Sequence, residues 1–202
     1  YNMRGNAYYS KVLYDKALDD YTACLKLNPR DSVTYVNRAN TYAGIKKYEL
    51  ALKDYNEAIS LNPNDAQLYN SRGLAYWNSS RPDQAIADYS KAISINPSFL
   101  SAYENRCFAY FTRGQNSAAL SDVNKLLELK PDNMQYHMLG IVLYMAQGDN
   151  QQAVAACNKM LEFPEYRWMA YVFRGLVYNV NGEYDKAFAD VSASLELNPN
   201  NP

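Results

Sequence analysis

AQLYNSRGLAYWNSSRPDQAIADYSKAISINPSF, residues 66–99, contains two amphipathic patterns of helical period separated by a short turn. In its first half Tyr69 and Tyr76 stand seven residues apart, on one face of an α-helix. Pro82 can begin a second helix, because the first turn of a helix does not need the missing N–H. Pro97 is expected to end that helix, since proline disfavours α geometry in the residue before it. The segment therefore predicts a helical hairpin.

The same pattern recurs along the chain with a period of 34 residues. Its markers are Pro29, Pro63, Pro97, Pro131 and Pro199; Ala17, Ala51, Ala85, Ala119, Ala153 and Ala187; and Tyr8, Tyr42, Tyr76, Tyr110, Tyr144 and Tyr178. A period of this length indicates an array of one supersecondary unit. We therefore expect an all-α fold, organised as a single array over residues 1–202. Its predicted units are a truncated 1–31, then 32–65, 66–99, 100–133, 134–167 and 168–201.

Composition excludes several classes of function. The formal net charge is −1 and there is no run of Lys or Arg, which argues against binding to nucleic acid or an anionic membrane. No apolar stretch approaches the roughly 20 residues of a membrane span. Cys24, Cys107 and Cys157 are predicted to be reduced core thiols, which is typical of a cytoplasmic location. Because Tyr1 lies inside a predicted helix, we expect the true N-terminus to be absent.

The order of an aromatic residue, a small residue, Tyr, Ala, an aromatic residue, Ala and Pro over 34 residues resembles the tetratricopeptide repeat. The resemblance extends over all six units. It implies a right-handed superhelical solenoid of antiparallel helix pairs, in which the first helix of each unit lines a concave groove. It also implies a protein–protein interaction scaffold that binds a peptide or partner segment in this groove.

One departure from that family's pattern predicts a structural ion pair within each repeat. An arginine replaces the family's leucine in the first helix, and an aspartate recurs sixteen residues later in the second. The pairs are Arg4–Asp20, Arg38–Asp54, Arg72–Asp88, Arg106–Asp122 and Arg174–Asp190. The unit 134–167 lacks both members, with Gly140 and Ala156 in their places. We expect the arginine to hold the carboxylate bidentately. The alternative is a row of arginines that binds an acidic ligand.

The opposite face of the first helices is the candidate binding surface. It changes from amide-rich to apolar along the chain, and its candidate contacts are Asn6, Asn37, Asn40, Asn70, Ser71, Asn105, Phe108, Leu139 and Phe173. Amides suit an extended peptide backbone, and apolar residues suit the aliphatic or aromatic anchors of a partner. The alternative is that these residues pack between adjacent helices. Asn2, Gln67 and Ser71 stand where the family's carboxylate clamp has cations, which argues against such a clamp here.

No catalytic, metal or cofactor site is predicted. The sole histidine, His137, occupies an aromatic core position, and no glycine-rich phosphate loop or Ser/His/Asp set is present. The atypical unit 134–167 represents either drift or a local change that shapes a pocket.

We therefore expect a non-enzymatic module that binds a protein or peptide. One alternative is a substrate-presenting part of a larger enzyme or of a secretion or assembly machine. Another is self-association through the last repeat, where Phe188, Val191 and Leu195 would be exposed because no capping helix follows.

Overall fold

The computed structural model describes residues 1–199 and divides into two compact units, Tyr1–Ala109 and Tyr110–Pro202. The last residues of the predicted unit 168–201, and the predicted uncapped end at Asn200, Asn201 and Pro202, lie outside the described residues. The boundary between the compact units falls within one helix. The organisation of residues 1–202 as a single array stays a prediction, and each unit is described by itself.

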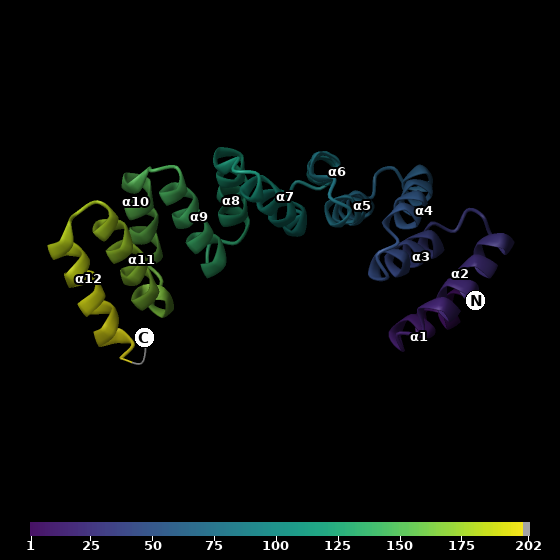
Figure 1. Cartoon of the computed structure of the whole chain (residues 1–202), viewed down its shortest axis with the longest axis horizontal. Helices are drawn as coiled ribbons and strands as arrows, with labels where there is room; N and C mark the ends of the chain where they lie inside the picture. Colours follow the sequence, from purple (N-terminus) through teal and green to yellow (C-terminus); the bar gives the residue numbers. More distant parts are fainter. Residues whose placement is uncertain (200–202) are drawn as a thin grey trace. The chain divides into compact units, whose positions relative to one another are not determined.

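Over residues 1–199 the structure contains twelve α-helices, one short 3-10 helix and no strand, which confirms the all-α fold (Figure 1). The first unit holds α1 (Asn2–Ser10), α2 (Tyr14–Leu27), α3 (Ser32–Gly44), α4 (Tyr48–Leu61), α5 (Ala66–Asn78), α6 (Pro82–Ile95) and the start of α7 (Leu100–Thr112). The second unit holds the end of α7, α8 (Asn116–Leu129), α9 (Met134–Ala146), α10 (Asn150–Met160), η1 (Pro164–Tyr166), α11 (Arg167–Val180) and α12 (Tyr184–Leu197).

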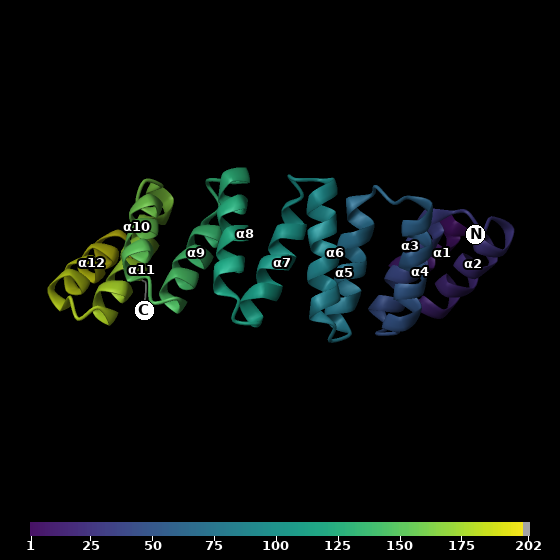
Figure 2. The same cartoon turned by 90° about the horizontal axis from the view of Figure 1, so that it is seen from above.

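Consecutive helices form antiparallel pairs that correspond to the predicted hairpins. The pair α3 and α4, the pair α5 and α6, and the pair α11 and α12 each lie side by side (Figure 2). No helix among the described residues is both long and apolar enough to cross a membrane.

Polar caps begin several of the first helices. The Asp31 carboxylate accepts the Thr34 N–H at 3.2 Å, Asp65 accepts the Gln67 N–H at 2.9 Å, and Asn133 accepts the Tyr136 N–H at 3.2 Å. These bonds satisfy backbone donors that have no partner inside the helix. Asp31 also accepts the Thr34 hydroxyl, and these bonds hold the pKa of its carboxyl below the ordinary value. Each cap lies just after the recurrent proline, so it restarts the helical pattern there.

The turn inside each hairpin uses a left-handed residue that the sequence pattern did not indicate. The backbone φ is 61° at Val12, 60° at Lys46 and 62° at Ser80. At the equivalent position the later repeats have glycine, which adopts this conformation without strain. The residue after the turn then donates its N–H back to the helix, as Leu13 does to the Tyr8 carbonyl at 2.9 Å.

The two helices of a hairpin interlock through small and large residues. The alanines of the second helices are buried, and Tyr21, Tyr55 and Tyr89 are at most 3% exposed. A Cβ placed on Gly73 would lie 2.6 Å from Cε1 of Tyr89, and one on Gly5 would lie 2.6 Å from Cε1 of Tyr21. The tyrosine ring therefore occupies the space that a side chain at the glycine would need.

Gly73→Ala should destabilise the fold by about 1–3 kcal/mol, because the added methyl group overpacks the contact with Tyr89. Gly44→Ala is the matched control, since nothing lies within 4 Å of the position that its Cβ would take and Gly44 ends helix α3. That substitution should stabilise by up to about 1 kcal/mol. Chemical denaturation of both variants measures the difference. Equal effects of the two substitutions would contradict the proposed close contact.

Candidate functional site

Bidentate ion pairs tie the two helices of a repeat together. Arg38 donates from Nε to Asp54 Oδ2 at 2.7 Å and from Nη2 to Oδ1 at 2.8 Å. Pairs of the same geometry, at 2.6–2.8 Å, join Arg4 to Asp20, Arg72 to Asp88 and Arg174 to Asp190. These four aspartates are buried. Arg106 and Asp122 fall in different compact units, and their pairing stays a prediction.

A third hydrogen bond extends each arginine to the preceding repeat. Nη1 of Arg38 donates to Thr22 at 3.1 Å, and Nη1 of Arg72 donates to Asn56 at 2.7 Å. The equivalent bonds run from Arg106 to Ser90 at 2.9 Å and from Arg174 to Asn158 at 2.6 Å. Sequence reasoning missed these acceptors. The available signal was an uncharged polar residue at the same place of every repeat.

Tyrosine rings complete the surroundings of the guanidinium. The Arg72 guanidinium lies 5.6 Å from the Tyr69 ring centroid and 5.8 Å from that of Tyr76, within the range of a cation–π contact. The hydrogen bond to Asp88 raises the pKa of Arg72 above its ordinary value. With Nε, Nη1 and Nη2 all donating inside the protein, this arginine is poorly placed to bind an acidic ligand. The geometry therefore favours the structural interpretation of the arginines.

Arg38→Ala should cost about 3–5 kcal/mol of unfolding free energy, because it leaves the Asp54 carboxylate buried without its partner. The double variant Arg38→Ala/Asp54→Ala should lose clearly less than the sum of the two single losses. Chemical denaturation of the full cycle measures this coupling.

The exposed pair between Arg81 and Glu49 provides the control for that cycle. Because both side chains are at least 37% exposed, Glu49→Ala should cost no more than about 1 kcal/mol. Additive losses in the Arg38 and Asp54 cycle would show that the buried pair has no special coupling.

The predicted groove amides of the first unit bond to one another across adjacent helices. Nδ2 of Asn37 donates to Oδ1 of Asn2 and to Oδ1 of Asn6, both at 3.0 Å. Further on, Nδ2 of Asn105 donates to Oδ1 of Asn70 at 2.9 Å. Asn70 is only 3% exposed, so its predicted contact with a partner does not fit the structure. It supports Asn105 instead.

Tyrosine hydroxyls orient two of the exposed amides. The Tyr21 hydroxyl donates to Oδ1 of Asn6 at 2.7 Å, and the Tyr55 hydroxyl donates to Oδ1 of Asn40 at 2.5 Å. These bonds use the amide oxygens of Asn6 and Asn40 and leave their Nδ2 groups without an intramolecular acceptor among the described residues. The oxygen of Asn37 is likewise left without a donor within residues 1–199. Asn6, Asn37 and Asn40 also line a hollow of about 190 Å³ together with Tyr9, Ser10 and Tyr21.

An apolar patch follows the amides in the same unit. Phe108 is 55% exposed, and its ring meets that of Trp77 edge-on at 5.6 Å. Leu74 is also exposed. Ser71, another predicted contact, is half-buried and accepts a hydrogen bond from Gln67 at 3.2 Å. The first unit thus places free amide groups and an aromatic anchor on its first helices.

The two predicted contacts in the second unit are less accessible. Phe173 packs against the buried cluster that contains Ile141, Cys157 and Met160. Leu139 is half-buried. Burial raises the pKa of the Cys157 thiol to about 12, so this cysteine is a core residue and not a reactive thiolate. In this unit the packing alternative accounts for Phe173.

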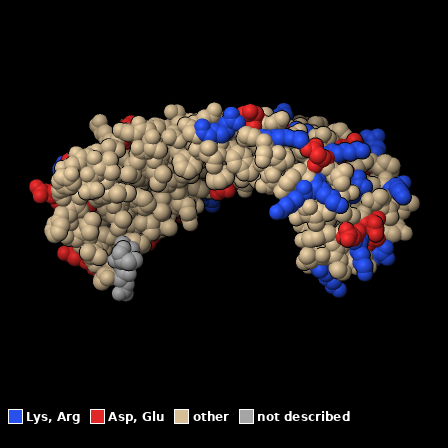
Figure 3. All heavy atoms as spheres, viewed as in Figure 1, with Lys and Arg blue, Asp and Glu red and all other residues tan. Residues whose placement is uncertain are grey.

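The charged residues do not form a field of one sign on the visible face of the first unit. Figure 3 shows Lys and Arg interspersed with Asp and Glu there, while the visible face of the second unit is largely uncharged. Among residues 1–199, no group of three or more His, Cys, Asp or Glu side chains is placed to hold a metal ion. Hydrogen bonds and apolar contacts are thus the main resources for recognition.

Three family models match segments of the chain. A model described as "Tetratricopeptide repeat" matches residues 1–31 and 66–99, and a second with the same description matches residues 109–167. A model described as "TPR repeat" matches residues 45–80. No curated protein sequence is significantly similar to the chain.

Solved structures share the fold. The MamA protein is 24% identical, with a TM-score of 0.71 over 81% of this chain and 89% of that chain. YrrB, described as a TPR protein with an unusual peptide-binding site, is 19% identical, with a TM-score of 0.69 over 89% and 93%. The first TPR of Spaghetti (RPAP3), bound to the HSP90 peptide SRMEEVD, is 25% identical, with a TM-score of 0.53 over 58% and 95%.

Proposed function

Because the chain belongs to the tetratricopeptide repeat family, we propose that the first helices of residues 1–109 bind an extended segment of a partner protein. The observation that carries the proposal is the set of amide atoms that internal hydrogen bonds leave free. The Nδ2 groups of Asn6 and Asn40 can donate to peptide carbonyls, and the oxygen of Asn37 can accept a peptide N–H.

These amides are held in place before a partner arrives. Tyr21 and Tyr55 are buried and each hydroxyl bonds one amide oxygen, while Asn37 bridges two amides of the preceding helix. Side chains that are already ordered lose less conformational entropy on binding. The amide network therefore supports recognition of a peptide backbone irrespective of its sequence.

Specificity would come from the apolar patch at Leu74, Trp77 and Phe108. An exposed aromatic ring beside a second ring suits an aliphatic or aromatic side chain of the partner. The neighbouring structures of YrrB and Spaghetti (RPAP3) support a peptide as the class of ligand. The HSP90 peptide of the latter is acidic, whereas Asn2, Gln67 and Ser71 provide no cation here. We therefore expect a segment with apolar anchors and no requirement for a terminal carboxylate.

Peptides selected by display against the whole chain provide the probe for this proposal. Asn40→Asp retains the oxygen that accepts from Tyr55 and removes the free Nδ2 donor, and Phe108→Ala removes the exposed ring. Each substitution should weaken the selected peptides by about tenfold, or about 1.4 kcal/mol. Calorimetric titration measures the affinity, and thermal unfolding checks that stability is unchanged.

Phe188→Ala is the matched control, because this phenylalanine is 76% exposed on α12, outside the proposed surface. Its removal should leave the affinity unchanged. Peptides that bind equally well to Asn40→Asp and Phe108→Ala, or that lose affinity with Phe188→Ala instead, would place binding elsewhere.

A further inference from the structure

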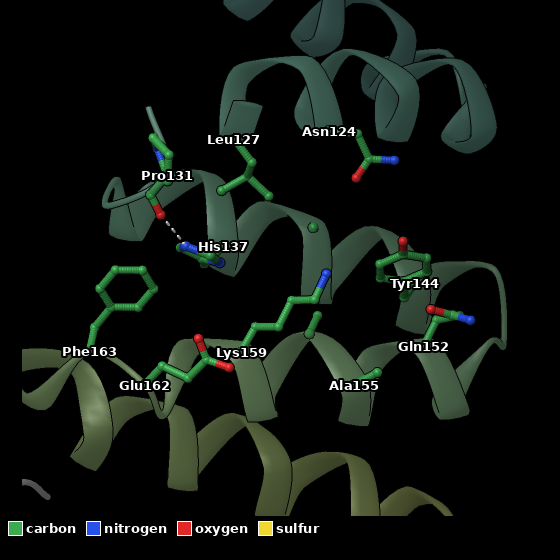
Figure 4. A pocket seen from close by; sticks show the side chains of 12 residues that line it. Asn124, Leu127, Pro131, His137, Tyr144, Gln152, Ala155, Lys159, Glu162 and Phe163 are labelled. Atoms are coloured by element: carbon green, nitrogen blue, oxygen red, sulfur yellow. Dashed lines mark hydrogen bonds between the residues drawn. The ribbon is translucent and has the colours of Figure 1, made fainter. Parts of the chain in front are cut away.

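A cavity of about 390 Å³ opens in the second unit at the repeat without an Arg–Asp pair (Figure 4). Its walls come from α8, α9 and α10 and from the turns after α8 and α10. The lining residues are Asn124, Leu127, Pro131, His137, Gly140, Tyr144, Gln152, Ala155, Ala156, Lys159, Glu162 and Phe163. A volume of this size, with mostly apolar walls and a few polar groups, is within the range of small-molecule sites.

The cavity exists because the chain omits the side chains that fill this place in other repeats. Gly140 stands where Arg38, Arg72 and Arg174 stand, and Ala156 replaces the paired aspartate. A Cβ placed on Gly140 would meet only Cγ1 of Val123, at 3.4 Å. The space left by the guanidinium and the carboxylate is therefore open.

The groups that surround the arginine in other repeats are retained around this cavity. Asn124 occupies the place of Asn56 and Asn158, which accept from an arginine of the next repeat. Within the described part of the chain, Asn124 has no hydrogen-bond partner. Tyr144 occupies the place of Tyr76 and Tyr178, whose rings face a guanidinium. The site thus keeps a polar group and an aromatic wall for an occupant that the chain itself does not supply.

The charges that line the cavity indicate an anionic occupant. Figure 4 shows the Lys159 side chain rising from α10 toward α9, with its amine aimed into the space that Asn124 and Leu127 face from α8. Lys159 has no hydrogen-bond or ion-pair partner among the described residues. The Glu162 carboxylate lies toward Phe163 at the other end, and Nε2 of His137 is occupied by the Pro131 carbonyl at 2.7 Å. A cation near Gly140 would meet Lys159, with the usual aspartate gone.

We propose that this cavity binds a small carboxylic acid with a planar apolar body. The carboxylate pairs with the Lys159 amine and accepts a hydrogen bond from the Asn124 amide, since charge-assisted bonds of this kind are the stronger ones. The planar body lies against Tyr144 and Leu127. Lys159 then takes the part of the missing arginine, and the ligand supplies the missing carboxylate.

This site is separate from the peptide surface proposed above. His137, Gly140 and Tyr144 lie on one face of α9, whereas Leu139 and Val142 lie on another. The proposal stands on Gly140, Ala156, Asn124 and Lys159, and none of these belongs to the first unit. Loss of peptide binding would therefore leave it unaffected.

Phenylacetate is a suitable probe, and phenylacetamide and benzamidine are its neutral and cationic counterparts. Titration of the whole ¹⁵N-labelled chain, followed by NMR, should give saturable shifts of the Asn124, Gly140 and Lys159 amides with phenylacetate. The expected dissociation constant is on the order of 1 mM or tighter. Phenylacetamide and benzamidine should each bind at least about tenfold more weakly. Tighter binding of benzamidine, or the absence of saturable shifts with phenylacetate, would overturn the proposal.

Two variants test the assigned roles. Lys159→Gln should weaken phenylacetate about tenfold and remove its advantage over phenylacetamide, because the charge is lost at an exposed position that the fold does not need. Gly140→Arg/Ala156→Asp should abolish binding by filling the cavity as the other repeats do. Lys130→Gln, at another exposed lysine of the same unit, is the control and should bind as the unaltered chain does. Unchanged affinity in both Lys159→Gln and the filled variant would contradict the proposed site.

Discussion

An arginine that bonds in two directions is the interaction on which the repeats depend. Its Nε and Nη2 hold the buried aspartate of its own hairpin, and its Nη1 reaches a polar side chain of the hairpin before it. Lysine could not replace it, because only the planar guanidinium offers these donors in fixed directions. The flanking tyrosine rings and the small residues of the first helices fit around this group. One side chain thereby joins the two helices of a repeat and also joins consecutive repeats.

The repeat at 134–167 shows the consequence of losing this group. Gly140 and Ala156 replace the pair, and the core there relies on Ile141, Cys157 and Met160, which are fully buried. Apolar packing thus maintains the contact between α9 and α10 but does not fill the volume of the guanidinium. The cavity is a direct consequence of the altered repeat. A construction rule that is broken once in a regular array is a physical reason to test that position for a binding role.

The sequence was sufficient for the helices, their pairing and the ion pairs. The period of 34 residues indicated the hairpins, and the joint presence and joint loss of arginine and aspartate indicated their contact. It was not sufficient for the turns at Val12, Lys46 and Ser80, because residues of these types rarely adopt a positive φ. It also misplaced Asn70, since helical register assigns a side chain to a face but does not show how closely the next helix covers it.

The polar groove illustrates the same limit at the level of atoms. The register placed Asn6, Asn37 and Asn40 on one face, but their mutual bonds and those from Tyr21 and Tyr55 depend on three-dimensional spacing. These bonds determine which amide atoms remain available to a partner. The groove is therefore partly a structural network and partly a binding surface, and the two alternatives drawn from the sequence are not exclusive.

The coupling free energy between Arg72 and Asn56 tests the central claim most directly, because these residues belong to consecutive repeats. It is measured by chemical denaturation of Arg72→Ala, Asn56→Ala and the double variant. If the arginine joins neighbouring repeats, the coupling should be about 0.5 kcal/mol or more in favour of the intact pair. A coupling within error of zero would show that Arg72 acts within its own hairpin alone and would contradict the account.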